Sequence, residues 1–199
     1  MDDLNSVIEE LQEKNFVLVG ESMAASIAIK YVTKYQGKAS KLVLLAGTPK
    51  WIKTDDYPYG GFGQDELQQR LEESGKSYSK GLRDIMELIF PEPGTEYLKD
   101  WGFKISQRTT LEITINSLVN FAKEDLRSLL PKIDIPTLII HGKNDMVSPV
   151  EGAKYMHENI SGSELYIFKD KGHMPNITAA DEFNKILKEF ITTGKLMKD

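Results

Sequence analysis

The chain has 199 residues, of which 40% are hydrophobic and 28% are charged, and its formal net charge is −5. This composition is typical of a globular protein with one sizeable core, and the acidic balance argues against binding to nucleic acid or to an anionic membrane. The absence of cysteine excludes disulfides, thiolate metal sites and a cysteine nucleophile.

The first residues of the chain predict an amphipathic helix that packs on a sheet. The segment is acidic and lacks the basic start and apolar core of a signal peptide. No apolar stretch approaches the length of about 18 residues that a membrane span needs, and together these features indicate a cytoplasmic location. The apolar residues at helical spacing are Leu4, Val7, Ile8 and Leu11.

Two short apolar runs predict strands on either side of a helix. Phe16 to Val19 and Lys41 to Leu45 are apolar throughout, as expected for strands that are covered on both faces. A helical pattern runs from Met23 to about Tyr35, and Gly37 ends it. A strand, a helix and a strand in this order imply a parallel sheet with a right-handed crossover.

Residues 50–132 predict helices without strands. We interpret this region as an all-helical cap inserted into a core that is formed by residues 1–49 and 133–199. Pro91 and Pro93 separate two of its helical patterns. The expected helices are Asp65 to Glu73, Tyr78 to Phe90, Glu96 to Phe103, Leu111 to Ala122 and Asp125 to Leu130.

The alternation of strands and helices returns after the insertion. The predicted fold class is therefore α/β, with a parallel sheet, flanking helices and an all-helical insertion. The expected elements are strands at Thr137 to His141 and Glu164 to Phe168, and helices at Val150 to Asn159 and Ala179 to Phe190.

A serine lies on the turn between the first strand and its helix, in the sequence Gly-Glu-Ser-Met-Ala. This is the context of a G-x-S-x-G nucleophile elbow, in which a tight turn lifts one hydroxyl above the edge of the sheet. The next backbone N–H and the helix N-terminus then point at the same place. Taken alone, Ser22 also fits the simpler role of a helix cap.

Two further polar residues follow later strands of the predicted sheet. Asp145 comes after the third strand and His173 after the fourth, so both are expected at the same sheet edge as Ser22. A serine needs a base to remove its proton, and a histidine base needs a carboxylate to orient it. Taken singly, Asp145 also fits a turn and His173 a surface loop. We assign no chemical role to His141, interpreted as a strand cap, or to His157, on a polar helix face.

Four segments carry a resemblance to a known family: VGESMA, KLVLLAGTP, LLPKIDIPTLIIHGKNDMVSP and FKDKGHMP. Together they resemble the α/β-hydrolase superfamily, in its esterase and lipase-like branch with a helical cap, and the order Ser, Asp, His matches. The resemblance implies that Ser22 is the nucleophile, His173 the general base and acid, and Asp145 the orienting carboxylate. It also implies that the Met23 backbone N–H belongs to the oxyanion hole. No metal or organic cofactor is implied.

A serine at the elbow, where dehalogenases and epoxide hydrolases have aspartate, implies acyl chemistry. The expected substrate is a small to medium carboxylic ester, thioester or lactone, cleaved through an acyl-enzyme. The insertion would form a lid, and its aromatic residues would either line an acyl pocket or pack inside the lid. These residues are Trp51, Tyr57, Tyr59, Phe62, Phe90, Trp101 and Phe103.

The chain departs from the family pattern in three ways. Glu21 stands where histidine or an aromatic residue is frequent, and Ala24 replaces the last glycine of the motif. The resemblance covers only the C-terminal two-thirds of the family fold, without the earlier strands and the loop that gives a second oxyanion-hole N–H. The first strand is therefore expected to be an apolar edge with unpaired backbone groups.

Three explanations of this departure stay open. The chain is a fragment of a longer product, or it pairs its edge with another copy or a partner, or it is a hydrolase that folds and barely turns over. Two functions follow: a serine esterase acting on a small-molecule ester, or a catalytically idle protein that binds a ligand or partner.

Overall fold

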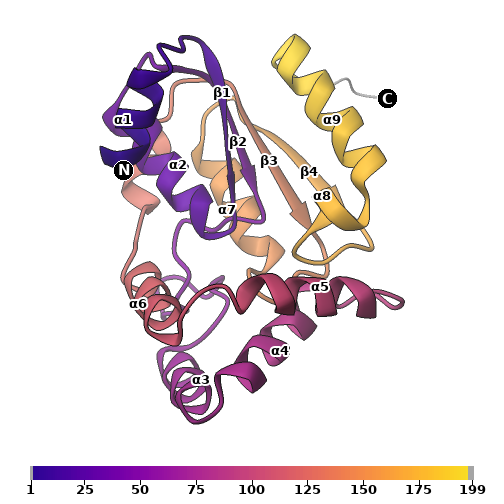
Figure 1. Cartoon of the computed structure of the whole chain (residues 1–199). Coiled ribbons are helices and arrows are strands. Elements are labelled where there is room, and N and C mark those ends of the chain that lie inside the picture. Colours follow the sequence, from indigo (N-terminus) through magenta and orange to yellow (C-terminus); the bar gives the residue numbers. More distant parts are fainter. Residues whose placement is uncertain (1, 197–199) are drawn as a thin grey trace.

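A parallel sheet of four strands organises the chain (Figure 1), and the predicted α/β class is confirmed. The computed structural model describes residues 2–196. Each strand pairs with its neighbour in parallel, and the order across the sheet follows the order along the chain. The strands are Phe16–Glu21 (β1), Ala39–Leu45 (β2), Thr137–Gly142 (β3) and Glu164–Phe168 (β4).

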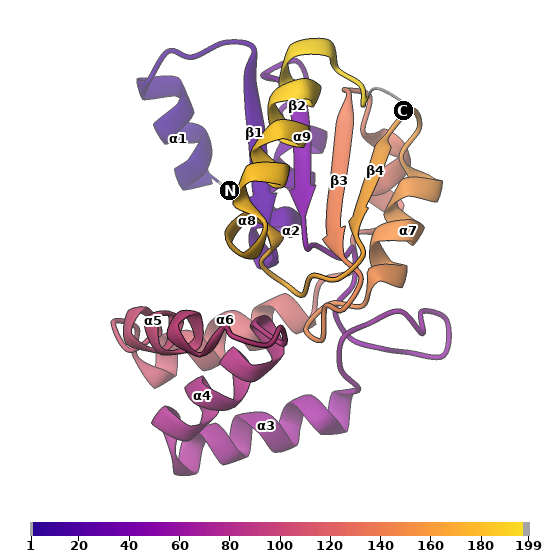
Figure 2. The same cartoon turned by 90° about the vertical axis from the view of Figure 1, so that its right-hand side faces the viewer.

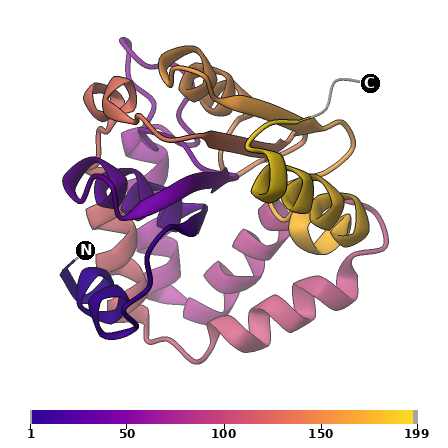
Figure 3. The same ribbon diagram turned by 90° about the horizontal axis from the view of Figure 1, so that it is seen from above.

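Helices cover both faces of the sheet, and the alternation of side chains along each strand divides the core in two. Leu42, Leu44 and Ile139 pack toward α2 and α7, whereas Val43 and Ile140 pack toward α9. Figure 3 shows α7 and α9 on opposite sides of the sheet. The helices around the sheet are Asp2–Glu10 (α1), Met23–Lys34 (α2), Val150–Asn159 (α7), Pro175–Thr178 (α8) and Ala180–Thr193 (α9).

The helical insertion lies across the carboxyl ends of the strands (Figure 2). Its last predicted helix is a 3-10 helix, η1, with Pro131 inside it. The division into a core and a separate cap domain stays a prediction. The elements of the insertion are Gln64–Lys76 (α3), Tyr78–Ile89 (α4), Glu96–Ser106 (α5), Leu111–Ala122 (α6) and Arg127–Lys132 (η1).

The two elements at the start of the chain differ in part from their prediction. Ile8 of α1 is buried and Leu4 packs against the core, but Val7 and Leu11 are exposed to 54% and 63%. β1 pairs only with β2 among the described strands, and its Val19 is 47% exposed. β1 is therefore an edge strand among the described strands, as predicted, and the cover on both faces that its apolar run suggested is only partial. Association of the protein through this edge stays a prediction.

No helix within residues 2–196 has the length and the apolar character that crossing a membrane requires.

Two glycines allow α2 to approach the sheet closely at the elbow. A Cβ atom on Gly20 would lie 2.6 Å from the carbonyl oxygen of Ala24 and 2.8 Å from the Cα of Ala25. A Cβ atom on Gly47, just after β2, would overlap the Cβ of Ala25. The N-terminus of α2 therefore lies so close to positions 20 and 47 that only glycine, which has no Cβ, fits there.

We expect Gly20→Ala to lower the free energy of unfolding by about 1–3 kcal/mol, because the added methyl group meets helix backbone that cannot rotate away. Urea denaturation followed by circular dichroism measures this change. Gly75→Ala is the matched control: a Cβ there meets nothing within 4 Å, and alanine favours the helix in which Gly75 lies. Equal destabilisation by both variants would contradict the packing argument.

Candidate active site

The turn between β1 and α2 holds Ser22 in a strained backbone conformation. Its φ is 53° and its ψ is −122°, and a positive φ of this kind favours glycine over residues with a side chain. The Ser22 N–H donates to the carbonyl of Leu45 at 2.8 Å, and the Ser22 carbonyl accepts from Ala25 N at 3.0 Å. The strand on one side and the helix on the other therefore fix the direction of the Ser22 hydroxyl.

The loop after β3 buries the carboxylate of Asp145, which is 7% exposed. Its Oδ1 accepts from the backbone N–H groups of Val147 at 2.8 Å and Ser148 at 2.9 Å. Burial raises the pKa of this carboxyl, but hydrogen bonds from His141 and His173 outweigh burial and hold the pKa well below its ordinary value. Asp145 is therefore a buried carboxylate that stays ionised.

His173 joins the serine to the carboxylate. Its Nδ1 lies 2.7 Å from Asp145 Oδ2, and its Nε2 lies 2.9 Å from Ser22 Oγ. Because an ionised carboxylate only accepts, Nδ1 carries the proton, and in the neutral ring Nε2 is free to accept from the Ser22 hydroxyl. The three residues that the sequence singled out thus meet at one point, although they follow three different strands.

A second histidine, His141, contacts the same carboxylate. It is fully buried near the end of β3, and its Nε2 lies 2.7 Å from the carbonyl oxygen of Ser148 and 3.1 Å from Asp145 Oδ2. Both neighbours are acceptors, so Nε2 carries the proton. The interpretation of His141 as a strand cap is therefore wrong. His157 lies on an exposed helix face, as predicted, and its Nδ1 is 2.9 Å from Ser163 Oγ.

Glu21, next to the nucleophile position, is partly buried rather than turned into solvent. Burial raises the pKa of its carboxyl above the ordinary value, although the charge of His173 and the amide of Asn176 act in the opposite direction. The Oε1 atom of Glu21 is buried without a hydrogen-bond partner. Burial therefore disfavours the charged form of this carboxyl beside Ser22.

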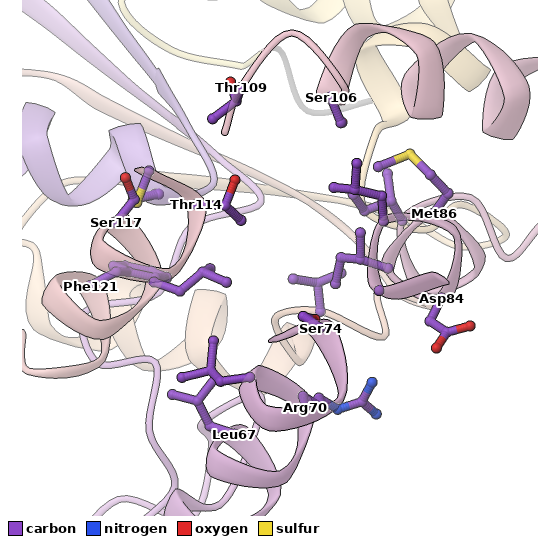
Figure 4. A pocket seen from close by; sticks show the side chains of 18 of the residues that line it. Leu67, Arg70, Ser74, Asp84, Met86, Ser106, Thr109, Thr114, Ser117 and Phe121 are labelled. Carbon is purple, nitrogen blue, oxygen red and sulfur yellow. The ribbon is translucent and has the colours of Figure 1, made fainter. Parts of the chain in front are cut away.

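A cavity of about 520 Å³ opens over Ser22 and His173 and extends between α3, α4 and α6 (Figure 4). Most of the lining surface is apolar, although serine and threonine side chains also border the cavity. Arg70 and Asp84, which also border the cavity, form ion pairs with Glu66 and Lys80 on their own helices. In Figure 4 Asp84 points away from the cavity. The apolar lining residues are Met23, Trp51, Leu67, Leu71, Leu82, Ile85, Met86, Ile89, Ile113, Leu118, Phe121 and Val147.

Seven aromatic residues were expected either to line an acyl pocket or to pack inside the lid, and of these only Trp51 lines the cavity. Phe62 packs with Trp51 in one apolar cluster of the insertion, and Phe90 and Phe103 belong to another. Tyr57 and Tyr59 contact each other and Tyr155, and Trp101 is 48% exposed. Phe121, which the sequence did not single out, also lines the cavity. Its ring stacks on that of Trp51, with the ring centroids 5.0 Å apart.

Comparison with known proteins agrees with this fold. A model of the family described as the alpha/beta hydrolase fold matches residues 1–180. The chain belongs to the α/β-hydrolase family. Among the similar structures, an esterase from Exiguobacterium antarcticum has 36% sequence identity and a TM-score of 0.91. That match covers 96% of this α/β-hydrolase and 72% of the esterase chain.

Two curated relatives are also similar to this α/β-hydrolase. The AB hydrolase superfamily protein YisY of Bacillus subtilis is 34% identical over 191 residues, which are 95% of this chain and 71% of the relative. A karrikin insensitive 2 receptor of Petunia hybrida is 26% identical over 191 residues, which are 95% of this chain and 70% of the relative. The family therefore includes similar proteins that are named as an esterase and as a receptor.

We expect His141→Leu to destabilise this α/β-hydrolase by about 1–3 kcal/mol near neutral pH, because it leaves two buried acceptors short of a donor. The ionised form of Asp145, whose pKa is lowered on folding, stabilises the protein above about pH 4. This stabilisation is lost as the pH falls through the pKa that Asp145 has in the folded protein. His141→Leu removes part of the stabilisation, so the difference in the free energy of unfolding between wild type and the variant should narrow below about pH 4.

Urea denaturation at a series of pH values measures the destabilisation and its dependence on pH. His157→Leu is the control, because that histidine is exposed and its ring contacts Ser163 instead of the Asp145 carboxylate. A difference between wild type and His141→Leu that is the same at every pH would contradict the link to Asp145.

Proposed function

We propose that this α/β-hydrolase is a serine hydrolase that cleaves a carboxylic ester, thioester or lactone through an acyl-enzyme. In this proposal Ser22 is the nucleophile, His173 the general base and acid, and Asp145 the orienting carboxylate. The chain of contacts from Ser22 Oγ to His173 Nε2 and from His173 Nδ1 to Asp145 Oδ2 supports it. This is the arrangement that an activated serine requires.

In the acylation step Ser22 Oγ attacks the carbonyl carbon while His173 Nε2 takes the hydroxyl proton. The tetrahedral intermediate collapses as His173 returns that proton to the leaving alcohol or thiol. In deacylation a water molecule attacks the acyl-enzyme, His173 takes its proton, and Ser22 leaves with that proton as the acid is released. Asp145 stays ionised and stabilises the imidazolium in both steps.

The backbone N–H of Met23 is the donor that we assign to the oxyanion. It belongs to the first turn of α2, whose N–H groups have no partner within the helix and whose dipole favours negative charge. A donor of this kind typically contributes about 100- to 1,000-fold in turnover. The residue that follows the nucleophile supplies this donor in nucleophile elbows.

The cavity favours an uncharged, apolar acyl group. Its volume of about 520 Å³ lies within the range of small-molecule sites, and most of its lining surface is apolar. The lining guanidinium of Arg70 already pairs with Glu66, and the carboxylates of Glu73 and Asp84 also border the cavity. An anionic substrate would therefore meet more repulsion than attraction.

A second candidate is a protein that binds a small apolar ligand in the same cavity and does not turn it over. The size of the apolar cavity supports it, as does the similarity to a protein that is named as a receptor. The two candidates differ in one measurable property, the reactivity of Ser22.

A fluorophosphonate probe, followed by intact-mass analysis, separates them. We expect single labelling of the wild-type chain, loss of labelling in Ser22→Ala and His173→Ala, and a rate lower by about 10⁴-fold in Asp145→Asn. His157→Ala is the matched control and should label like wild type. A folded wild-type chain that takes up no label would reject the hydrolase in favour of the ligand-binding protein.

We expect Ile85→Trp to shift selectivity toward shorter acyl chains, because Ile85 lines the cavity on α4 and the larger ring fills part of it. The measurement is kcat/KM on a series of p-nitrophenyl esters of increasing chain length. Ile105→Trp makes the same exchange on α5, where Ile105 is 41% exposed and outside the cavity lining. An equal profile for both variants would mean that the acyl chain binds elsewhere.

A further inference from the structure

The loop that carries His173 is held from two sides. On the side of the sheet, Lys143 N donates to the carbonyl of Phe168 at 2.8 Å and Asn144 N donates to the carbonyl of Lys171 at 2.9 Å. On the other side, the contacts come from the helical insertion. The base is therefore attached to the insertion as well as to the core.

Two successive backbone N–H groups of this loop donate to the insertion. Gly172 N donates to Glu92 Oε1 at 2.7 Å, and His173 N donates to the carbonyl of Ile89 at 3.3 Å. The Ile89 carbonyl is one of the last of α4, which lack partners within the helix. Glu92 Oε1 also accepts from the Thr178 hydroxyl at 3.1 Å, so one carboxylate oxygen joins both ends of the segment that contains His173.

The turn that presents Glu92 is rigid. Glu92 lies between Pro91 and Pro93, whose rings fix their own φ and restrict the residue before them. The Thr95 hydroxyl closes the turn by donating to the Glu92 carbonyl at 2.6 Å and to the Phe90 carbonyl at 3.1 Å. The carboxylate is thus held in one place with little conformational entropy left to lose.

Steric contacts leave little room to move for the loop that carries His173, here called the base loop. A Cβ on Gly172 would overlap the Cδ of Pro91, and a Cβ on Gly142 would overlap the carbonyl oxygen of Gly172. Met174 and Ile177, which follow His173, pack against the insertion cluster that includes Met86 and Phe90. The loop is therefore enclosed between the end of β3 and the turn at Pro91.

We propose that Glu92 is a positioning residue that sets His173 for proton transfer between Ser22 and the substrate. This inference rests on the proposed serine hydrolase. Glu92 is not among the residues that line the cavity, so it acts on the reaction through the base loop and not through substrate binding. The insertion then helps to build the catalytic geometry in addition to covering it.

Three variants at Glu92 test this proposal. Glu92→Ala removes the acceptor, Glu92→Asp keeps the charge and shortens its reach, and Glu92→Gln keeps an acceptor oxygen at the right distance. Glu87→Ala is the matched control, because Glu87 is an exposed carboxylate on the same insertion that pairs with Lys99 at 2.6 Å. Thermal unfolding establishes that each variant is folded.

The kinetic readout is the rate of fluorophosphonate labelling together with kcat and KM for an uncharged ester. We expect Glu92→Ala and Glu92→Asp to lower the labelling rate and kcat by about 10- to 100-fold with KM unchanged, because a small displacement of a catalytic group has an effect of this size. Glu92→Gln should retain most of the rate. Wild-type rates in Glu92→Ala and Glu92→Asp, or an equal loss in Glu87→Ala, would overturn the proposal.

A second readout does not depend on turnover. The proton on His173 Nδ1, hydrogen-bonded to Asp145, gives a downfield resonance in the NMR spectrum of the full chain, and His173→Ala assigns it. We expect this resonance to broaden or shift in Glu92→Ala and to persist in Glu92→Gln. An unchanged resonance in Glu92→Ala would overturn the positioning role, whereas failure of wild type to react with the probe would overturn the proposed function alone.

Discussion

The buried negative charge of Asp145 is the constraint on which the geometry of the site depends. Nitrogen atoms from three stretches of chain surround it: two backbone N–H groups of its own loop, His141 from β3 and His173 from the loop after β4. A buried charge that loses a partner typically destabilises a protein by several kcal/mol. The end of β3, the loop that follows it and the base loop therefore hold one another in place.

The strain at Ser22 is the complementary constraint. A serine with φ of 53° persists only where its surroundings leave no alternative, and here β1 is bonded to β2 while α2 packs closely on Gly20 and Gly47. The backbone fixes the Ser22 hydroxyl, and the charge of Asp145 fixes the His173 ring. The Ser22 Oγ and His173 Nε2 atoms lie 2.9 Å apart. A parallel sheet makes this meeting possible because its strands end at one edge.

The sequence was sufficient to predict the parts of the fold that depend on local signals. The strands β3 and β4 and the helices α6 and α7 begin and end within one residue of their prediction, because apolar runs, Pro and Gly mark their ends. Ser22, Asp145 and His173 could be singled out because each lies in the turn or loop that follows an apolar strand, and the family resemblance implied their roles. Their contacts with one another depend on the parallel order of the strands, which the alternation of elements also predicts.

Features that depend on tertiary packing could not be predicted from local sequence signals. His141 looks like any polar residue at the end of a strand, and its contact with Asp145 exists because the loop turns back over β3. The aromatic residues of the insertion have the right composition for a pocket, but helix packing turned Phe62, Phe90 and Phe103 into core residues of the insertion. Val7 and Leu11 follow a helical period although no described element covers them.

The insertion has two surfaces with different physical roles, and α4 carries both. Along the helix, Ile85, Met86 and Ile89 face the cavity with apolar side chains. At its end, the Ile89 carbonyl and the Glu92 carboxylate hold the loop of His173. A rigid shift of α4 would therefore move the wall of the cavity and the base together. In the proposed mechanism, a substrate that displaces this wall would also shift His173, so substrate binding and proton transfer would be coupled through a single helix.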